Sequence, residues 1–282
     1  MVINMAHNIQ QIDYTQLHLV DKPDVVYKYR SWNGGSTNSD RTLTHNELYL
    51  SAPSDFDDPL DCKIPERYDL MNDEEKRKWI RRVLKNNHPN FNDIAIERDV
   101  EHYHKRTFND DAKMEEFAKY EWESYNEKSG ILSLCKDVNN LQMWECYGDH
   151  HKGICYGFHT DTLIESCEIG MGGDVIYDNE LPIIHPLQDI IVKAALRVMY
   201  KLTKWEFEDE YRLRTFHESN AIAANRKKYY PPESLVEVTI GKNFDAQQEE
   251  QIKQELRNKG SIAVLYRSVE NNDILTRQQI AY

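Results

Sequence analysis

The sequence has few of the residues that are abundant in small domains held together by disulfides or metal ions: its 282 residues include 5 Cys, 11 Gly and 9 Pro. An odd number of cysteines in a long chain, with no CxxC pair, argues against a disulfide framework and a zinc ribbon. No apolar run approaches the roughly 18 to 20 residues that a membrane span needs. The N-terminal segment lacks the charged and then apolar pattern of a signal peptide. We therefore expect a cytoplasmic protein without a membrane partner.

Basic residues are also in the minority, with 35 Lys and Arg against 48 Asp and Glu, a net charge of −13. This balance argues against a general nucleic-acid or membrane-surface binder, although it leaves room for a local basic pocket. The GxxxxGK[ST], GxGxxG, GxSxG and HExxH motifs are absent, so the sequence gives no support for a kinase, a Rossmann-type protein, a hydrolase or a zincin. Tyrosine is abundant, with 17 Tyr against 8 Phe, and indicates a half-polar core or a ring-lined pocket.

The order of the expected elements favours an α+β fold with mixed or antiparallel central sheets. Residues 1–22 are expected to form an N-terminal arm, and residues 23–282 a single α+β domain. A helical insertion at about residues 66–128 is predicted from apolar residues at helical spacing. Helices are also expected at 139–151, 187–203 and 245–259. Strands are expected at 24–30, 47–51, 130–135, 154–158, 174–177, 205–216, 235–240, 262–266 and 274–282.

The first predicted strand carries a candidate anion site. Side chains alternate along a strand, so Lys28 and Arg30 share one side, and Tyr27 and Tyr29 share the other. Two cations on one face can hold an anion, and Arg suits bidentate phosphate contacts. The other interpretation is an ordinary solvated face.

The predicted strand at 205–216 carries a candidate carboxylate site. The same alternation places Glu208, Glu210, Arg212 and Arg214 on one face. Glu208 or Glu210 could bind ribose hydroxyls or act as a base. Arg212 could pair with Glu210 or bind an anion, and a salt-bridged outer face fits the pattern equally well.

The predicted helix at 139–151 places Trp144, Tyr147 and His151 on one face. These side chains could form the wall of a site for an aromatic or adenine-sized ligand, or they could pack into the core. Cys146 and His150 could be half of a metal site, but no second half has convincing spacing, so no metal is expected. Asp57 and Asp58 fit a turn-capping role better than a calcium loop.

Five ordered motifs resemble a bacterial and phage-borne family known as domain of unknown function 2971. They are YKYR at 27–30, ELYLSAPSDFDDPLDC at 47–62, GILSLC at 130–135, MWECYGDHHKGICYGF at 143–158 and KWEFEDEYRLRTF at 204–216. The acidic loop of that family usually reads FNDPFD, and this chain has Asp57 at the Asn position.

The order of three of these motifs also resembles ADP-ribosyltransferases, in which a first-strand His or Arg holds NAD and a late strand carries a catalytic Glu. This resemblance implies a split β-sandwich in which Lys28 or Arg30 holds NAD. Ser51 would take the middle position, and Glu210 or Glu208 the catalytic one. Tyr29 or Trp144 could stack on a ring of the ligand.

The resemblance further implies an enzyme that consumes NAD as its substrate, or that modifies a protein or nucleic-acid target with ADP-ribose. Such an enzyme would suit a toxin or a phage-defence effector. Two alternatives stay open: a non-catalytic module that binds a nucleotide or a protein, and a nuclease.

Overall fold

The computed structural model describes residues 22–108, 110–217 and 221–282. Residues 1–21 of the expected N-terminal arm lie outside this range. No helix within these ranges is both long and apolar enough to cross a bilayer.

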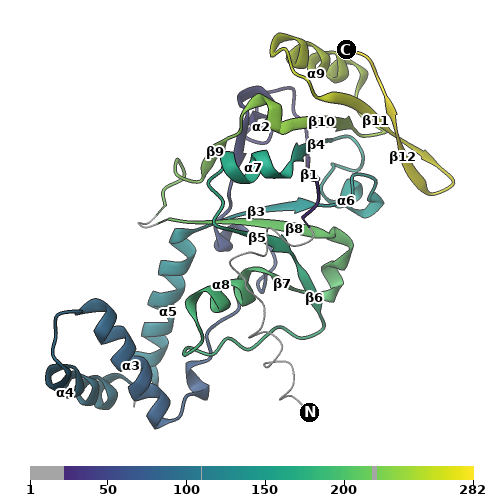
Figure 1. Ribbon diagram of the computed structural model, residues 1–282. Helices are drawn as coiled ribbons and strands as arrows, with labels where there is room; N and C mark the ends of the chain where they lie inside the picture. Colours follow the sequence, from purple (N-terminus) through teal and green to yellow (C-terminus); the bar gives the residue numbers. More distant parts are fainter. Residues whose placement is uncertain (1–21, 109, 218–220) are drawn as a thin grey trace.

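The α+β class predicted from the sequence is confirmed by a large mixed sheet surrounded by helices (Figure 1). The sheet has eight strands in the order β12-β11-β10-β4-β1-β3-β8-β5. The β10–β11 pair is parallel and the other pairs are antiparallel. Its strands are β1 (Val25–Arg30), β3 (Ser129–Cys135), β4 (Ile154–His159), β5 (Met171–Asp174), β8 (Glu210–Phe216), β10 (Leu235–Ile240), β11 (Val264–Asn271) and β12 (Ile274–Gln279).

Two short ribbons and a set of helices complete the described fold. Antiparallel β2 (Glu47–Tyr49) and β9 (Lys227–Tyr229) form one ribbon, and parallel β6 (Ile176–Asp178) and β7 (Tyr200–Leu202) form the other. The α-helices are α2 (Arg41–His45), α3 (Asp73–Asn87), α4 (Asp93–Tyr103), α5 (Asp111–Lys128), α6 (Leu141–Cys146), α7 (Thr160–Ser166), α8 (Ile190–Val198) and α9 (Ala246–Asn258). Short 3-10 helices lie at Pro53–Asp55, Tyr68–Leu70, Thr203–Glu208 and Pro232–Ser234, and a π-helical turn at His104–Phe108.

Strand β1 separates from its neighbour β3 and thereby opens the middle of the sheet. In the described part of the chain, β1 pairs with β4 at every residue from Val25 to Arg30. It pairs with β3 at a single position, Tyr27 with Cys135. Between that position and Ile131, which Ser51 bridges, the backbone of β3 therefore faces a gap instead of a strand.

Separate apolar clusters pack on the two faces of β1 beside this gap. Val26, Tyr156, Phe158 and Leu213 belong to the largest core cluster. A second cluster, on the other side of β1, packs Tyr29 against Trp144 and Cys155. The strand at the gap is thus anchored on both faces, which is what a rigid binding site requires.

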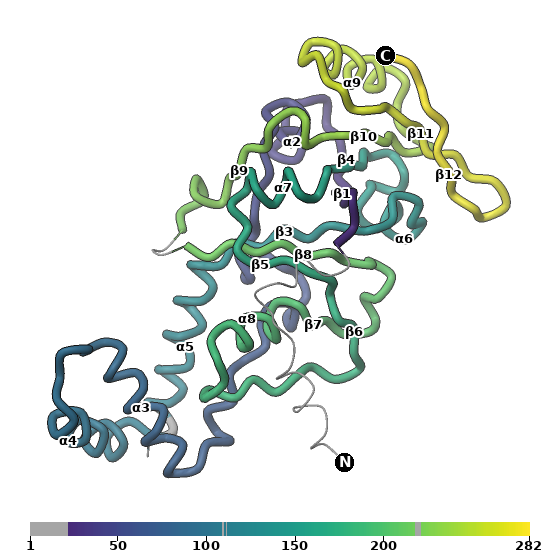
Figure 2. The backbone as a smooth tube through the Cα atoms, in the orientation of Figure 1, coloured from purple at the N-terminus to yellow at the C-terminus, as the bar shows by residue number. Residues whose placement is uncertain are grey.

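Helices α3, α4 and α5 project from the rest of the molecule, at the lower left of Figure 1, and the tube in Figure 2 shows the same separation. They enclose their own apolar cluster, in which Trp79 contacts Phe108 and Phe117 with ring centroids 5.2 and 5.1 Å apart. Asn72 caps α3 by accepting hydrogen bonds from the backbone amides of Glu74 and Glu75. The three helices fall within the range expected for the insertion.

Four expected elements differ from the structure. The helix predicted at 139–151 ends at Cys146, and His151 has a left-handed backbone, so it does not share a helix face with Trp144 and Tyr147. The strand predicted at 174–177 is divided between β5 and β6. The strand predicted at 205–216 begins only at Glu210, because Thr203–Glu208 forms a 3-10 helix and Asp209 is left-handed, with φ 41°. The helix predicted at 187–203 ends at Val198 and is followed by β7. In the segments 187–203 and 205–216, the periodic apolar pattern that predicted the element continues past the point where the element ends, so the pattern does not reveal the turn.

Candidate functional site

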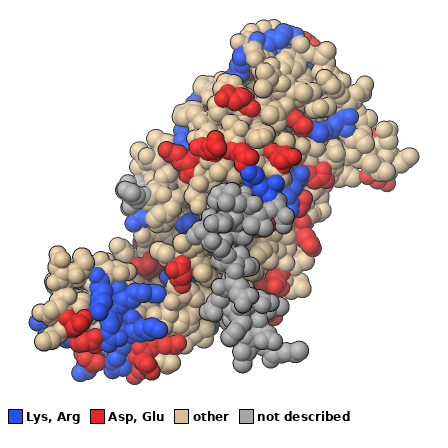
Figure 3. Space-filling model, in the orientation of Figure 1, with Lys and Arg blue, Asp and Glu red and all other residues tan. Residues whose placement is uncertain are grey.

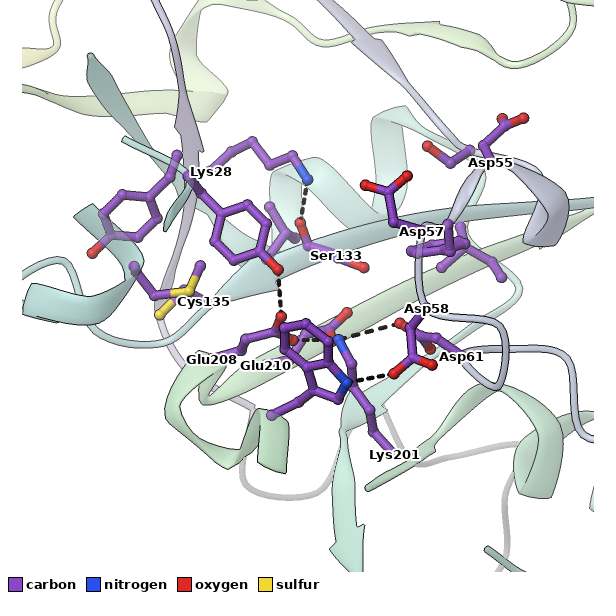
Figure 4. Close-up of a pocket in the computed structure, with 18 of the residues that line it drawn as sticks. Lys28, Asp55, Asp57, Asp58, Asp61, Ser133, Cys135, Lys201, Glu208 and Glu210 are labelled. Atoms are coloured by element: carbon purple, nitrogen blue, oxygen red, sulfur yellow. Dashed lines mark hydrogen bonds and ion pairs between the residues drawn. The ribbon is translucent and has the colours of Figure 1, made fainter. Parts of the chain in front are cut away.

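A cavity of about 320 Å³ occupies the gap between β1 and β3 (Figure 4). Its walls come from β1, β3, the start of β8, the acidic loop at 55–61 and the residues around α6 and β7. The charged lining residues are six carboxylates and three cations: Asp55, Asp57, Asp58, Asp61, Glu208, Glu210, Lys28, Arg30 and Lys201. Residues that are far apart in sequence therefore meet in one site.

Lys28 spans the gap. Its Nζ donates a 2.6 Å hydrogen bond to the main-chain oxygen of Ser133, so a side chain replaces the missing strand partner. Burial, and then the nearby charge of Arg30, lower the pKa of Lys28 to about 7. The ammonium is thus poised to gain or lose its proton near neutral pH.

Arg30 lies beside Lys28 and also lines the cavity. Its Nε is buried and, among the described residues, finds no acceptor. Burial lowers the pKa of this guanidinium. A buried donor without a partner favours a ligand that brings an acceptor.

Glu208 is the best-oriented carboxylate of the cavity. Its Oε1 accepts a 2.6 Å hydrogen bond from the Tyr147 hydroxyl, and its Oε2 accepts one from Lys201 Nζ. The side chain is 5% exposed. Burial raises the pKa of Glu208 above 4.5, and Glu210 adds to this rise, whereas Lys201 and Tyr147 oppose it.

Glu210 is held by Arg212 in a buried bidentate pair. Arg212 Nε and Nη2 donate to its two oxygens at 2.6 and 2.7 Å. Arg212 also donates to Asp61 at 2.9 Å and to the Val198 carbonyl at 2.6 Å, and is itself fully buried. Burial would raise the pKa of Glu210, but Arg212 and Lys201 outweigh it and lower the pKa to about 2.

The acidic loop is attached to this charged cluster at Asp58 and Asp61. Asp61 accepts from Arg212 and lies 3.2 Å from Lys201 Nζ. Asp58 accepts from the indole nitrogen of Trp205. Asp55 and Asp57 are exposed, and Figure 4 shows both on the side of the cavity opposite Glu208.

The remaining predicted site residues divide into two groups. Tyr29 and Ser51 line the cavity, and Ser51 exchanges backbone hydrogen bonds with Ile131 of β3. Trp144 and His151 do not line it. Trp144 is fully buried and donates to the Val138 carbonyl at 2.9 Å, while the His151 ring stacks on Trp144 with centroids 6.1 Å apart.

Arg212 also lies behind the cavity wall rather than on it, and Arg214 is 8% exposed and close to the Tyr125 ring. The outer-face interpretation of β8 is wrong, because Glu210, Arg212 and Arg214 are all buried. The hydrogen bonds of Arg212 to Glu210 and Asp61 support the carboxylates of the cavity.

Sequence reasoning missed Lys201, Trp205 and Tyr27 as lining residues. Lys201 contacts Glu208, Asp61 and Glu210, so one ammonium interacts with three carboxylates. No sequence signal distinguishes it from a solvent-exposed lysine. The tyrosine excess was a usable signal, since Tyr27, Tyr29, Tyr49 and Tyr147 all line the cavity.

Within the described ranges, no group of three or more His, Cys, Asp and Glu side chains is arranged to hold a metal ion. The structure thus defines a mixed α+β protein with a charged, ring-lined cavity in a split sheet. Residues 143–213, which include parts of α6 and β8 and both cavity glutamates, match the family described as Protein of unknown function (DUF2971). This match agrees with the family resemblance predicted from the motifs. Neither a curated protein nor a solved structure matches it.

Proposed function

We propose that the protein is an ADP-ribosyltransferase-like enzyme that takes NAD as substrate and breaks its nicotinamide–ribose bond. One observation carries the proposal: Lys28 and Arg30 line the same cavity as Glu208 and Glu210. The volume of about 320 Å³ lies within the range of about 300–1,000 Å³ typical of small-molecule sites.

The charge distribution of the cavity matches the polarity of NAD. Its pyrophosphate is anionic, and Lys28 with the unsatisfied Arg30 Nε supplies cationic donors on the β1 side. Its nicotinamide ring is cationic, and the ribose carbon becomes cationic as the bond breaks. The carboxylate of Glu208 provides complementary charge at the opposite wall.

Glu208 would carry the chemistry, and Glu210 would support it. Glu210 is already neutralised by Arg212. Glu208 is fixed by Tyr147 and Lys201 at the cavity wall. When the C–N bond breaks, its electron pair passes to the nicotinamide nitrogen, and a nucleophile adds to the ribose carbon. A fixed carboxylate next to that carbon stabilises the oxocarbenium-like transition state.

Such a reaction depletes NAD or attaches ADP-ribose to a protein or nucleic-acid target, and either outcome would suit a toxin or a phage-defence effector in the cytoplasm. The test measures NAD binding by calorimetry and nicotinamide release by chromatography, with and without candidate targets. Binding with release supports the proposal. Binding without release with every target would indicate a non-catalytic nucleotide-binding module, and absence of binding would refute the proposal.

A further inference from the structure

One face of helix α3 carries four cations, of which Lys78 and Lys85 are exposed and Arg81 and Arg82 partly exposed. Residues 76–85 include six Lys and Arg and no Asp or Glu. Lys78, Arg81, Arg82 and Lys85 follow the i, i+3, i+4, i+7 spacing of one helix face. The buried residues of α3 are Trp79, Ile80 and Leu84, on the opposite face. Figure 3 shows Lys and Arg gathered at this end of the molecule, despite the net charge of −13.

The charges of this face are only loosely compensated. Arg81 pairs with Glu97 and Lys85 with Asp93, and all four side chains are more than a third exposed. Such exposed pairs contribute little to stability and exchange readily. Arg82 donates to the main-chain oxygens of Pro186 and Leu187, so its positive charge is not neutralised. Lys78 is exposed and has no partner within the described part of the chain.

A stacked ring pair stands where this face ends. His88 follows Lys85 by one helical turn, and its ring lies on the ring of Phe91 with centroids 4.6 Å apart and planes 15° apart. Phe91 is 46% exposed, although burial would be favourable for a side chain of its size. Because the two rings are stacked on each other, each leaves its outer face for a ligand, and the pair follows the last cation of the row in the chain.

We propose that the α3 face, defined as Lys78, Arg81, Arg82 and Lys85 with the His88–Phe91 pair, binds a single-stranded nucleic acid. The cations would contact the phosphates, and a base would stack on the rings, as in other sites for single strands. The rings favour a nucleic acid over an acidic peptide or a lipid headgroup, because only the nucleic acid offers planar bases that can stack on them. This face is remote from the cavity in the β1–β3 gap, so its binding does not depend on the proposed reaction.

The test is fluorescence anisotropy of a short labelled single-stranded RNA of mixed sequence, titrated with the full chain at about 50 mM and about 200 mM salt. The wild type should bind, with a modest salt dependence because few phosphates are contacted. The double variant Lys78→Gln/Lys85→Gln should bind at least about fivefold more weakly and reduce the log–log salt slope by about 1 to 2. Phe91→Ala should weaken binding by roughly five- to hundredfold.

The matched control is Lys152→Gln/Arg257→Gln, which removes the same charge from exposed positions outside α3. It should leave RNA binding unchanged. Equal losses in both double variants would mean that only net charge matters and would overturn the proposal. No RNA binding at about 100 µM protein in low salt would overturn it as well. So would tighter binding to anionic phospholipid vesicles than to the RNA.

Discussion

Glu210 and Arg212 lie two residues apart on β8 and form a bidentate ion pair in the interior, with N–O distances of 2.6 and 2.7 Å. The same guanidinium also bonds to Asp61 of the acidic loop and to Val198 at the end of α8. One side chain therefore joins the strand and the loop that line the cavity to the end of α8. Glu210 has a bidentate partner of its own, whereas Glu208 pairs with Lys201, which also contacts Asp61 and Glu210. For this reason the proposed chemical role is assigned to Glu208.

Replacing Arg212 should damage the fold more than it damages any ligand contact. In Arg212→Met, Glu210 and Asp61 become buried carboxylates without their main cation, and the unfolding free energy should fall by about 3–5 kcal/mol. Urea denaturation measures this loss. Arg67→Met, which breaks the exposed Arg67–Asp69 pair, should unfold like the wild type. Equal stability of the two variants would contradict the role of Arg212.

Lys28 should make NAD capture decline as pH rises. Its pKa of about 7 means that the ammonium is charged below neutrality and loses its proton above it. The kcat/KM for NAD should therefore fall as pH increases through about 7, since this ratio reports the free enzyme. A bound phosphate raises the pKa again, so calorimetry at pH about 8 in two buffers should detect proton uptake on binding.

The matched variant is Lys28→Arg, because arginine keeps its charge throughout this range. The decline near pH 7 should disappear from its kcat/KM profile. If the variant shows the same decline, another group is responsible.

Tyr147→Phe should shift the acidic limb of the reaction upward. The phenol of Tyr147 donates to Glu208 and lowers its pKa, so loss of this bond should raise that pKa further. Glu208 must be ionised to stabilise a cation, so activity should begin to fail at a higher pH than in the wild type. The pH profile of nicotinamide release provides the measurement. Tyr120→Phe, at a side chain that is 65% exposed, is the control and should keep the wild-type profile.

Trp144 should matter for stability and not for NAD affinity. Its indole nitrogen bonds to the Val138 carbonyl, and its ring meets Tyr29 edge to face at 5.2 Å. Trp144→Phe leaves the carbonyl without this donor and should lower the unfolding free energy by about 1–3 kcal/mol. Thermal unfolding tests the expected loss of stability, and calorimetry with NAD tests whether the affinity is unchanged. A large loss of NAD affinity in the folded variant would place Trp144 at the ligand after all.

Strand positions could largely be predicted, because β-branched and aromatic residues mark β1, β4 and β10, and a short apolar run marks β3. The turn at Asp209 could not, since the alternation of Trp205–Phe216 continues through a left-handed residue. The burial of Arg212 could not be predicted either, because a charged residue on a strand usually indicates a solvent-exposed face, whereas here it forms a buried ion pair with Glu210.

The site was only partly predictable for a related reason. Five of the predicted residues stand in recognisable sequence motifs and also line the cavity: Lys28, Arg30, Ser51, Glu208 and Glu210. Lys201 depends on a three-dimensional neighbourhood of three carboxylates that no local pattern records. The gap itself depends on how β1 pairs with β3, which is a property of the sheet and not of either strand.

The most direct measurement of the central claim compares nicotinamide release from NAD by the wild type, Glu208→Gln and Glu206→Gln. Glu206 is an exposed neighbour outside the cavity, so its variant is the matched control. We expect Glu208→Gln still to bind NAD by calorimetry but to release nicotinamide at least about a hundredfold more slowly, whereas Glu206→Gln matches the wild type. Release by Glu208→Gln at the wild-type rate would show that Glu208 has no part in the reaction.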